Sequence, residues 1–216
     1  AGQTAEWFEA VADLEIALFI DESESLEEFC SPELLSQRPN ERFEYPSNDL
    51  FKGRPFFSGQ NWPSRLLELG IDKVLVLVPN NQCRLNILKI CSEYKFNLIS
   101  AIHPTVQIMN QASIEPGVWI NAGAIIGYKT EIKSGALITT RAIVEHHNIL
   151  ESCCQLDPAV VTAGNVTIGE CAHIHMGALI ANRKKIGANA IVGAGAVVLS
   201  DIAPDLKVAG VPAKVI

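Results

Sequence analysis

Five histidines offer the side chains best suited to proton transfer near neutral pH. An imidazole has an unperturbed pKa of about 6.5, so it can take a proton from an attacking nucleophile or bind a metal ion. The five are His103, His146, His147, His173 and His175. His146 and His147 are neighbours, and His173 and His175 stand two residues apart. Which of them can act together depends on the fold that positions them.

The cysteines do not predict a metal centre. They are Cys30, Cys83, Cys91, Cys153, Cys154 and Cys171. They form no CxxC pair and show no zinc-finger spacing. We therefore expect no metal site. We interpret the cysteines as reduced thiols in a reducing compartment, several of them serving as small apolar side chains.

Composition and charge narrow the class of protein. The formal net charge of −7 argues against broad nucleic-acid binding, which requires a basic face. A small phosphate-bearing ligand is still compatible, because a few basic side chains or helix-start amides can hold it. No apolar stretch is long enough to span a membrane, and the start lacks the basic and apolar regions of a signal peptide. We expect a cytoplasmic protein.

A period of six residues dominates the second half of the chain. In steps of six from Ile102 to Val198, every position except Thr162 is isoleucine, valine or leucine. A second row, four residues after the first, is mostly small. Its exceptions are Asn148, Lys184 and Ile202. A period of six fits neither a helix nor a simple alternating strand. It predicts short strands joined by corners and stacked into a parallel β-helix with a continuous core.

The first hundred residues follow a different pattern. We expect helices over residues 5–12, 64–69 and 82–95, and buried strands over 15–20, 74–78 and 98–101. Strands that alternate with helices predict a small parallel α/β domain. A polar, proline-containing stretch, residues 23–63, interrupts it.

The opening residues carry a weak signal of phosphate binding. Gly2 stands just ahead of the first expected helix, and Asp21 and Glu22 close the next expected strand. A glycine turn before a helix, with an acidic residue after the next strand, is typical of nucleotide-binding α/β units. Such a unit has a strand before the glycine turn, and we expect that first strand to be missing from this sequence.

Nearly the whole chain resembles the hexapeptide-repeat acetyltransferases that modify sugar nucleotides for bacterial surface glycans such as lipopolysaccharide. These are the bacillosamine and perosamine N-acetyltransferases and the sialic acid O-acetyltransferase group. The matching segments are Ala1–Ala5 (AGQTA), Phe19–Glu22 (FIDE), Pro79–Asn81 (PNN), Ile102–Pro104 (IHP), Ile143–His146 (IVEH), Ala163–Gly169 (AGNVTIG), Val192–Val198 (VGAGAVV) and Val208–Lys214 (VAGVPAK).

The resemblance implies an α/β plus all-β architecture. A small Rossmann-like parallel α/β domain, residues 1–101, binds a nucleotide sugar. A left-handed parallel β-helix, residues 102–203, has three hexads per coil, so residues eighteen apart stack directly. A tail, residues 204–216, contributes to coenzyme A binding. The resemblance also implies a homotrimer, with the active site shared between neighbouring chains.

The resemblance further assigns His146 as the general base for acetyl transfer from acetyl-CoA. Gly164, one coil above, leaves room for the pantetheine arm and directs its N–H at the thioester carbonyl. Asn182 continues this row. Lys185 and Lys214 are candidates to bind the phosphates of coenzyme A.

Several positions depart from the family pattern around this base. Relatives often carry a carboxylate directly after the base, where this chain has His147. Three other positions also differ from the relatives. Thr4 stands where relatives have a histidine, Thr139 where they have an asparagine, and Gln155 where some bacillosamine enzymes have a second histidine. Either Glu145 or His147 orients His146, or the amine arrives already neutral and needs little help. His103 is expected to be structural, and His173 and His175 to lie on the surface or face a partner subunit.

The expected substrate is a nucleotide-linked deoxyamino sugar, with UDP as the favoured nucleotide. The residues expected to contact it are Gly2, Thr4, Asp21, Glu22, Asn80, Asn81, Tyr128 and Thr139. The main hypothesis is N-acetylation of its amino group with acetyl-CoA as donor and no metal. Two alternatives stay open: an O-acetyltransferase acting on a sugar hydroxyl, as in sialic acid, and a non-catalytic trimeric scaffold.

Overall fold

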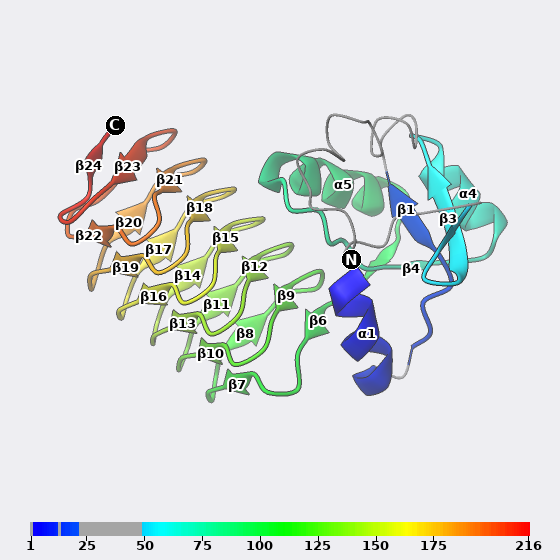
Figure 1. Ribbon diagram of the computed structural model, residues 1–216, viewed down its shortest axis with the longest axis horizontal. Coiled ribbons are helices and arrows are strands. Elements are labelled where there is room, and N and C mark those ends of the chain that lie inside the picture. Colours follow the sequence, from blue (N-terminus) through cyan, green and yellow to red (C-terminus); the bar gives the residue numbers. More distant parts are fainter. Residues whose placement is uncertain (1, 13, 22–48) are drawn as a thin grey trace. The chain divides into compact units, whose positions relative to one another are not determined.

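The computed structural model describes residues 2–12, 14–21 and 49–216. The chain forms two compact units, Ala1–Asp72 and Lys73–Ile216. Both are drawn in Figure 1. The sequence assigned residues 73–101 to the first domain, whereas in the structure they belong to the compact unit that contains the β-helix. In the described ranges, no helix is long and apolar enough to cross a membrane.

The first unit is a small mixed α/β region. Its elements are α1 (Gly2–Val11), β1 (Phe19–Asp21), β2 (Leu50–Phe51), β3 (Arg54–Ser58) and α4 (Trp62–Glu68). β1 pairs with β3 in parallel, but β2 pairs with β3 antiparallel. The antiparallel strand β2 lies in the stretch, residues 23–63, for which no strand was expected. Its direction follows from a two-residue hairpin loop: Lys52 and Gly53 both have positive φ, 49° and 72°, as the tightest β-hairpin turn requires.

The second unit opens with a strand, a helix and a strand: β4 (Lys73–Val74), α5 (Asn81–Glu93) and β5 (Asn97–Leu98). β4 and β5 pair in parallel. The strand expected over residues 74–78 is shorter than predicted, because β5 offers only two partner residues before the chain enters the first coil. The side chain of Asn80 caps α5, where its Oδ1 accepts the N–H of Cys83 at 3.0 Å.

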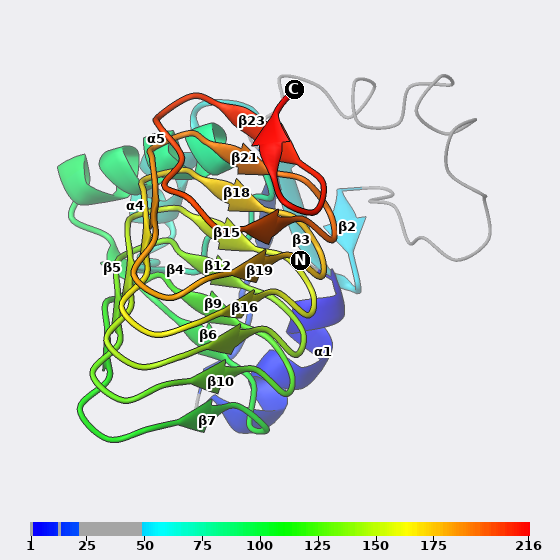
Figure 2. The ribbon, with the colours of Figure 1, turned by 90° about the vertical axis from the view of Figure 1, so that its left-hand side faces the viewer.

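The rest of the second unit is a parallel β-helix of three sheets, whose stacked coils are seen in Figure 2. Sheet 1 contains β7 (Gln107–Ile108), β10 (Ile125–Ile126), β13 (Ile143–Val144), β16 (Val161–Thr162), β19 (Leu179–Ile180) and β22 (Val197–Val198). Sheet 2 contains β8 (Ser113–Ile114), β11 (Glu131–Ile132), β14 (Ile149–Leu150), β17 (Thr167–Ile168) and β20 (Lys185–Ile186). Sheet 3 contains β6 (Ala101–Ile102), β9 (Trp119–Ile120), β12 (Leu137–Ile138), β15 (Gln155–Leu156), β18 (His173–Ile174), β21 (Ile191–Val192), β23 (Lys207–Ala209) and β24 (Lys214–Val215).

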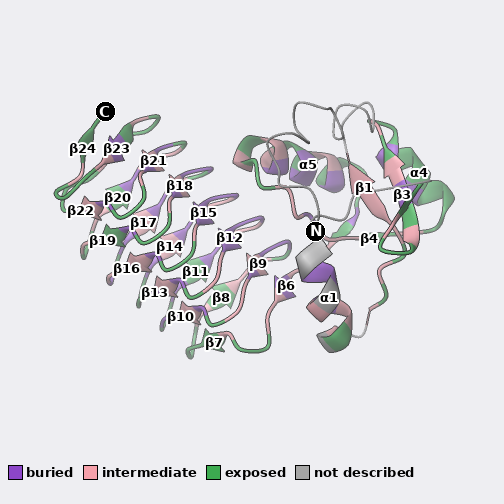
Figure 3. Cartoon of the chain, in the orientation of Figure 1, coloured by how far each residue is buried: buried purple, intermediate pink, exposed green. Residues whose placement is uncertain are grey.

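The predicted hexad pattern and the stacking of residues eighteen apart are both confirmed. Ile126 pairs with Val144, and Val144 pairs with Thr162. The first row points inward, and Ile126, Val144 and Ile168 are completely buried. Figure 3 shows buried residues recurring along every coil. The last coil departs from the pattern, because Val192 pairs with Val208, only sixteen residues later.

Each coil turns at corners closed by a residue in the left-handed conformation. His147, Asn165 and Arg183 recur at this position with φ of 58°, 59° and 59°. A two-residue turn with positive φ at its second residue needs no glycine when asparagine or another tolerant residue stands there. Three columns of corners result. The His146 corner comprises 127–130, 145–148, 163–166 and 181–184. The Asp157 corner comprises 121–124, 139–142, 157–160 and 175–178. The helix corner comprises 133–136, 151–154 and 169–172.

α5 is fastened to the helix corner by a buried arginine. Arg84 is completely buried, and its Nε donates to the carbonyl of Gly135 at 2.7 Å. Its Nη2 donates to the carbonyl of Cys153 and to Asn81 Oδ1, both at 2.8 Å. Burial lowers the pKa of this guanidinium from its ordinary value. A Cβ on Gly135 would lie 2.5 Å from Leu88 Cδ1, so the glycine allows the helix to approach the coil closely.

The cysteines near this corner are packing residues, as expected. Cys91, Cys153, Cys154 and Cys171 are buried free thiols. Burial raises the pKa of the Cys91 and Cys153 thiols to about 11 in each case. Thiols with raised pKa are poor nucleophiles at neutral pH, so these cysteines are inert side chains of the core.

Candidate active site

His146 and His147 occupy the two central positions of a turn at the His146 corner. Both side chains are exposed, and their Nδ1 atoms lie 3.0 Å apart, within hydrogen-bond distance. The rings meet edge to face with centroids 5.2 Å apart. One of the two nitrogens must carry the proton while the other accepts it. When His146 is the donor at Nδ1, its Nε2 is unprotonated and can accept a proton.

Gly164 lies directly against the His146 ring. A Cβ added to Gly164 would be 2.5 Å from His146 Nε2 and 3.0 Å from its Nδ1. The backbone φ of Gly164 lies outside the left-handed region, so the requirement for glycine here is space and not conformation. The predicted juxtaposition of these two residues, one coil apart, is therefore present in the structure.

Gly127, which the sequence reasoning missed, supports the same turn from the coil below. A Cβ at Gly127 would be 2.5 Å from the carbonyl carbon of Glu145 and 2.7 Å from the backbone nitrogen of His146. The Gly127 N–H also donates to the carbonyl of Val144 at 2.7 Å. The signal in the sequence was a glycine eighteen residues before Glu145, at a position where the two coils touch.

A buried polar set holds the inner side of the turn. Asn148 Nδ2 donates to Thr162 Oγ1 at 2.7 Å, and Asn148 Oδ1 accepts the N–H of Val166 at 2.5 Å. One coil below, Thr130 Oγ1 donates to the carbonyl of Glu145 at 3.0 Å. Asn148, Thr130 and Thr162 are all completely buried. Thr162 is the exception in the aliphatic first row, and Asn148 is an exception in the mostly small second row. These two polar side chains hydrogen-bond to each other.

The two predicted helpers of His146 differ in their contacts. His147 contacts His146, whereas the described residues include no hydrogen bond between the Glu145 carboxylate and either imidazole. Tyr128 lies one coil below, with its ring 5.6 Å from that of His147 and edge to face with it. Its carbonyl accepts the N–H of His147 at 2.8 Å. Of the two helpers, only His147 touches the candidate base.

The predicted coenzyme A residues follow the outside of the β-helix. The coil of Asn182 stacks on that of Gly164, whose carbonyl accepts the N–H of Arg183 at 3.0 Å. Lys185 is exposed and begins β20. Lys214 is exposed in β24, which pairs antiparallel with β23. All three side chains are open to solvent, as binding of a phosphate-bearing arm requires.

Predicted substrate residues fall in several places. Thr139 lies at the Asp157 corner, so within one chain β13 separates it from His146. Its buried Oγ1 has no hydrogen-bond partner among the described residues. Gly2 begins α1 instead of preceding it, and Thr4 is a buried residue of that helix. Asp21 ends β1 half-buried, and Glu22 lies outside the described residues.

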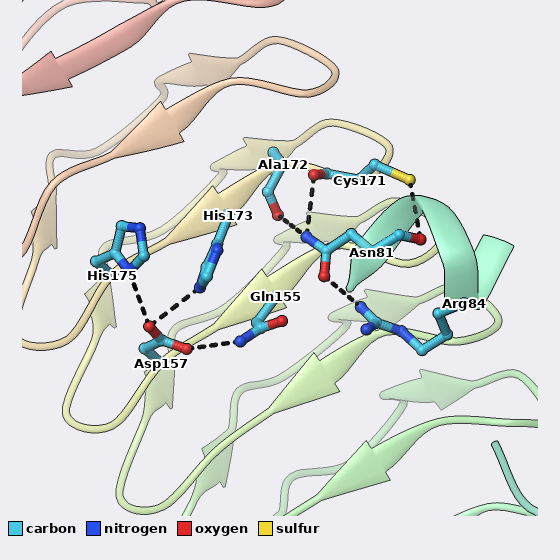
Figure 4. A network of polar contacts seen from close by, with 8 residues as sticks. All are labelled: Asn81, Arg84, Gln155, Asp157, Cys171, Ala172, His173 and His175. Atoms are coloured by element: carbon cyan, nitrogen blue, oxygen red, sulfur yellow. Dashed lines mark hydrogen bonds and ion pairs between the residues drawn. The ribbon is translucent and has the colours of Figure 1, made fainter. Parts of the chain in front are cut away.

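Asn80 and Asn81 both have structural contacts. Asn80 caps α5. Asn81 Nδ2 donates to the carbonyl of Cys171 at 3.0 Å, and its Oδ1 accepts from Arg84. The contacts of Asn81 are drawn in Figure 4. Their assignment to a nucleotide pocket stays a prediction, and the structure adds that Asn81 joins α5 to the helix corner.

His173 and His175 were expected at the surface or against a partner. In the structure both are partly buried and both contact Asp157, at the Asp157 corner (Figure 4). His103, at the coil entrance, lies 2.9 Å from Thr105 Oγ1 through its Nδ1. The two histidine groups therefore occupy different corners of the β-helix.

The chain was compared with protein families and with solved structures. The chain matches no protein-family model. It is similar to PerB from Caulobacter crescentus in complex with CoA and GDP-perosamine, with 28% identity over 95% of this chain and 100% of that one, at a TM-score of 0.77. A mutant of perosamine N-acetyltransferase from the same organism, with the same ligands, matches at 28% identity over 95% and 99% of the chains and a TM-score of 0.76.

A second enzyme matches almost as well. The acetyltransferase domain of PglB from Neisseria gonorrhoeae, in complex with acetyl coenzyme A, shares 25% identity over 94% of this chain and 100% of that one, with a TM-score of 0.73. These similarities span both the α/β region and the β-helix. Together with the hexad pattern and the coils that it builds, they show that the chain has the fold of the hexapeptide-repeat acetyltransferases and is similar to them over nearly its full length.

Proposed function

We propose that this protein is an acetyl-CoA-dependent N-acetyltransferase for the amino group of a nucleotide-linked deoxyamino sugar. The observation that carries the proposal is the His146 imidazole held against Gly164, in a chain similar over nearly its full length to PerB in complex with CoA and GDP-perosamine. Transfer from a thioester to an amine requires a base for the proton that leaves nitrogen and a donor for the developing oxyanion.

His146 is the proposed base. As the amine nitrogen attacks the thioester carbonyl, a C–N bond forms and His146 Nε2 takes the proton released from nitrogen. Collapse of the tetrahedral intermediate breaks the C–S bond and releases coenzyme A. General base catalysis of this kind contributes about 10²–10⁴-fold to a rate. The exposure of the His146 side chain leaves its Nε2 accessible to an acceptor sugar.

Gly164 is the proposed oxyanion donor. Within the described chain its N–H donates to no protein acceptor, although its carbonyl accepts the N–H of Arg183. A backbone N–H that lacks an acceptor beside the base is suited to a thioester oxygen on which charge develops. Because Gly164 has no side chain, it leaves space for both the His146 imidazole and the pantetheine arm.

His147 is the proposed orienting residue for His146. Its Nδ1, 3.0 Å from His146 Nδ1, accepts the His146 proton and fixes the tautomer with Nε2 unprotonated. A neutral imidazole supports the protonated base less than a carboxylate would. This difference favours an amine acceptor, which attacks without prior loss of a proton, over a sugar hydroxyl.

The remaining assignments follow the family. Asn182, Lys185 and Lys214 are proposed to bind coenzyme A, and Tyr128 to line the acceptor site. Thr139 and His146 lie at two different corners of one chain, which supports a site completed by a neighbouring copy in a trimer. A chain that is fully active as a monomer at assay concentration would contradict the shared site.

The test compares two acceptors that differ in one atom group. Release of thiol from acetyl-CoA is measured with a 4-amino-4,6-dideoxy sugar and its 4-hydroxy analogue, each linked to UDP and, separately, to GDP. Release with the amine only establishes the N-acetyltransferase, and the two nucleotides identify the preferred carrier. Release with the hydroxyl compound only establishes an O-acetyltransferase. No release with any compound, while acetyl-CoA still binds, would contradict the proposal for this substrate class.

A further inference from the structure

Asp157, His173 and His175 form a second cluster of chemically active side chains, at the Asp157 corner. Asp157 and His175 are eighteen residues apart and hold the same position on consecutive coils, while His173 lies in β18. His173 Nε2 and His175 Nδ1 each lie 3.1 Å from Asp157 Oδ2. One donor atom of each residue falls within 4.8 Å of the other two. Figure 4 shows the two rings converging on the carboxylate.

We infer that these three side chains bind a divalent transition metal ion, with Zn²⁺ as the principal occupant. Zinc binds histidine nitrogen and carboxylate oxygen at about 2.0–2.2 Å. Ligand atoms on such a tetrahedral ion stand about 3.3–3.5 Å apart. The two nitrogen-to-oxygen distances of 3.1 Å therefore need to open by only a few tenths of an ångström. The ion would replace the protons by which the imidazoles contact the carboxylate.

A further residue holds the carboxylate in place. Gln155 is largely buried, and its Nε2 donates to the other carboxylate oxygen, Asp157 Oδ1, at 2.8 Å. This contact directs Oδ2 at the imidazoles, as outer residues do around protein metal sites. The backbone beneath is rigid, because the Asp157 N–H donates to Ile174 at 2.9 Å and the His175 N–H to Val192 at 2.8 Å.

The charge of the cluster suits a cation. The Asp157 carboxylate accepts hydrogen bonds from His173, His175 and Gln155. It lies beside two imidazoles, which bind metals in their neutral form. A set of two nitrogens and one oxygen favours zinc and its first-row neighbours over magnesium or calcium, which prefer oxygen alone.

Three protein ligands leave one position of a tetrahedral ion for water or another small ligand. Because the ligands come from consecutive coils, the ion would tie these coils together. This inference revises the sequence-based expectation of no metal. None of its three ligands is assigned a role in the proposed acetyl transfer.

The test uses the full chain without a histidine tag, stripped of metal by chelation and gel filtration. Zn²⁺ is titrated in competition with a chromophoric chelator. The inference predicts one Zn²⁺ bound per chain. Asp157→Asn and His175→Ala abolish this binding, and Gln155→Ala weakens it by about 10–100-fold. His147→Ala is the matched control, because it disrupts the other histidine pair and should leave the zinc affinity unchanged.

A second readout reports the geometry directly. Co²⁺ bound at this site should give the intense visible absorption of a tetrahedral ion, and Zn²⁺ should displace it. Asp157→Asn should lose this absorption while keeping the far-ultraviolet circular dichroism of the β-helix, which separates loss of the site from loss of the fold. Absence of stoichiometric zinc binding by the unsubstituted chain, or binding that survives in both ligand variants, would overturn the inference.

Discussion

The His146 corner and the Asp157 corner use the same turn and each has two histidines in it or directly beside it, yet their environments differ. At the first, His146 and His147 are exposed and contact one another. At the second, His173 and His175 are partly buried and both converge on an ionised carboxylate. The difference is one of partners and exposure, not of residue type.

Exposure and partners determine which role each group of histidines can take. A base must reach a substrate, so an exposed imidazole with one nitrogen oriented by a neighbour is suited to proton transfer. A metal ligand must converge with others on one point, so partly buried imidazoles beside a carboxylate are suited to an ion. The β-helix provides both, because each corner repeats every eighteen residues and can be modified separately.

Gly164→Ala should give the largest separation of function from stability at the His146 corner. The added methyl group displaces the His146 ring, so we expect kcat to fall about 10³-fold. The ring is exposed and can rotate, so the free energy of unfolding should change by less than about 0.5 kcal/mol. Steady-state kinetics and thermal unfolding check both. Gly195→Asn, at an open left-handed position of another corner, is the control and should affect neither quantity.

Metal addition at the Asp157 corner should change the stability of the protein, whereas Gly164→Ala at the His146 corner should change its activity. At a Zn²⁺ concentration of about 100 times its Kd, the ion stabilises the folded state by about 2.7 kcal/mol. For a chain of this size, the corresponding rise in Tm is about 5–10 °C. Scanning calorimetry checks it, and Asp157→Asn should eliminate the rise. An equal rise in that variant would mean that zinc stabilises the protein elsewhere.

Asn148→Leu should weaken the inner support of the His146 corner. The Val166 N–H and the Thr162 hydroxyl both lose their partner in the core, so we expect a loss of about 2 kcal/mol in the free energy of unfolding. Adding Thr162→Val removes one of the two unsatisfied groups and should restore part of the loss. Chemical denaturation of the single and double variants measures this coupling. Strictly additive losses would argue against a shared network.

His147→Gly should have the smallest effect of the series. Glycine accepts the left-handed backbone of this position, so the substitution removes the imidazole without strain. We expect a fall in kcat of about tenfold, because His146 loses the group that fixes its tautomer. His147→Asn, whose side-chain oxygen can accept the same proton, should recover part of the rate. An unchanged rate in both variants would show that His146 needs no orienting partner.

The fold was predictable where it depends on period. A large aliphatic residue every six positions allows little except a stacked corner-and-strand architecture, and the paired strands follow it. The same spacing predicts from the sequence alone that Gly164 lies above His146. It would also have placed Asp157 beneath His175, but no rule of local spacing relates an aspartate to two histidines on the next coil.

The features that the sequence did not predict depend on tertiary contacts. The β2 strand is antiparallel because Lys52 and Gly53 form a tight turn within a stretch that shows no periodic pattern. Arg84 reads as an ordinary surface residue of a helix, yet it is completely buried among backbone carbonyls of the helix corner. Such contacts depend on which coil faces the helix, and sequence periodicity carries no information on that.

In the proposed mechanism, His146 takes the proton from the amine and does not bind the acetyl donor. The most direct measurement determines kcat with the amino-sugar nucleotide and the Kd for acetyl-CoA, for the unsubstituted chain and for His146→Ala. We expect a fall in kcat of about 10²–10⁴-fold with a Kd unchanged within about twofold. Equal losses in kcat and in acetyl-CoA binding, or no loss in either, would contradict it.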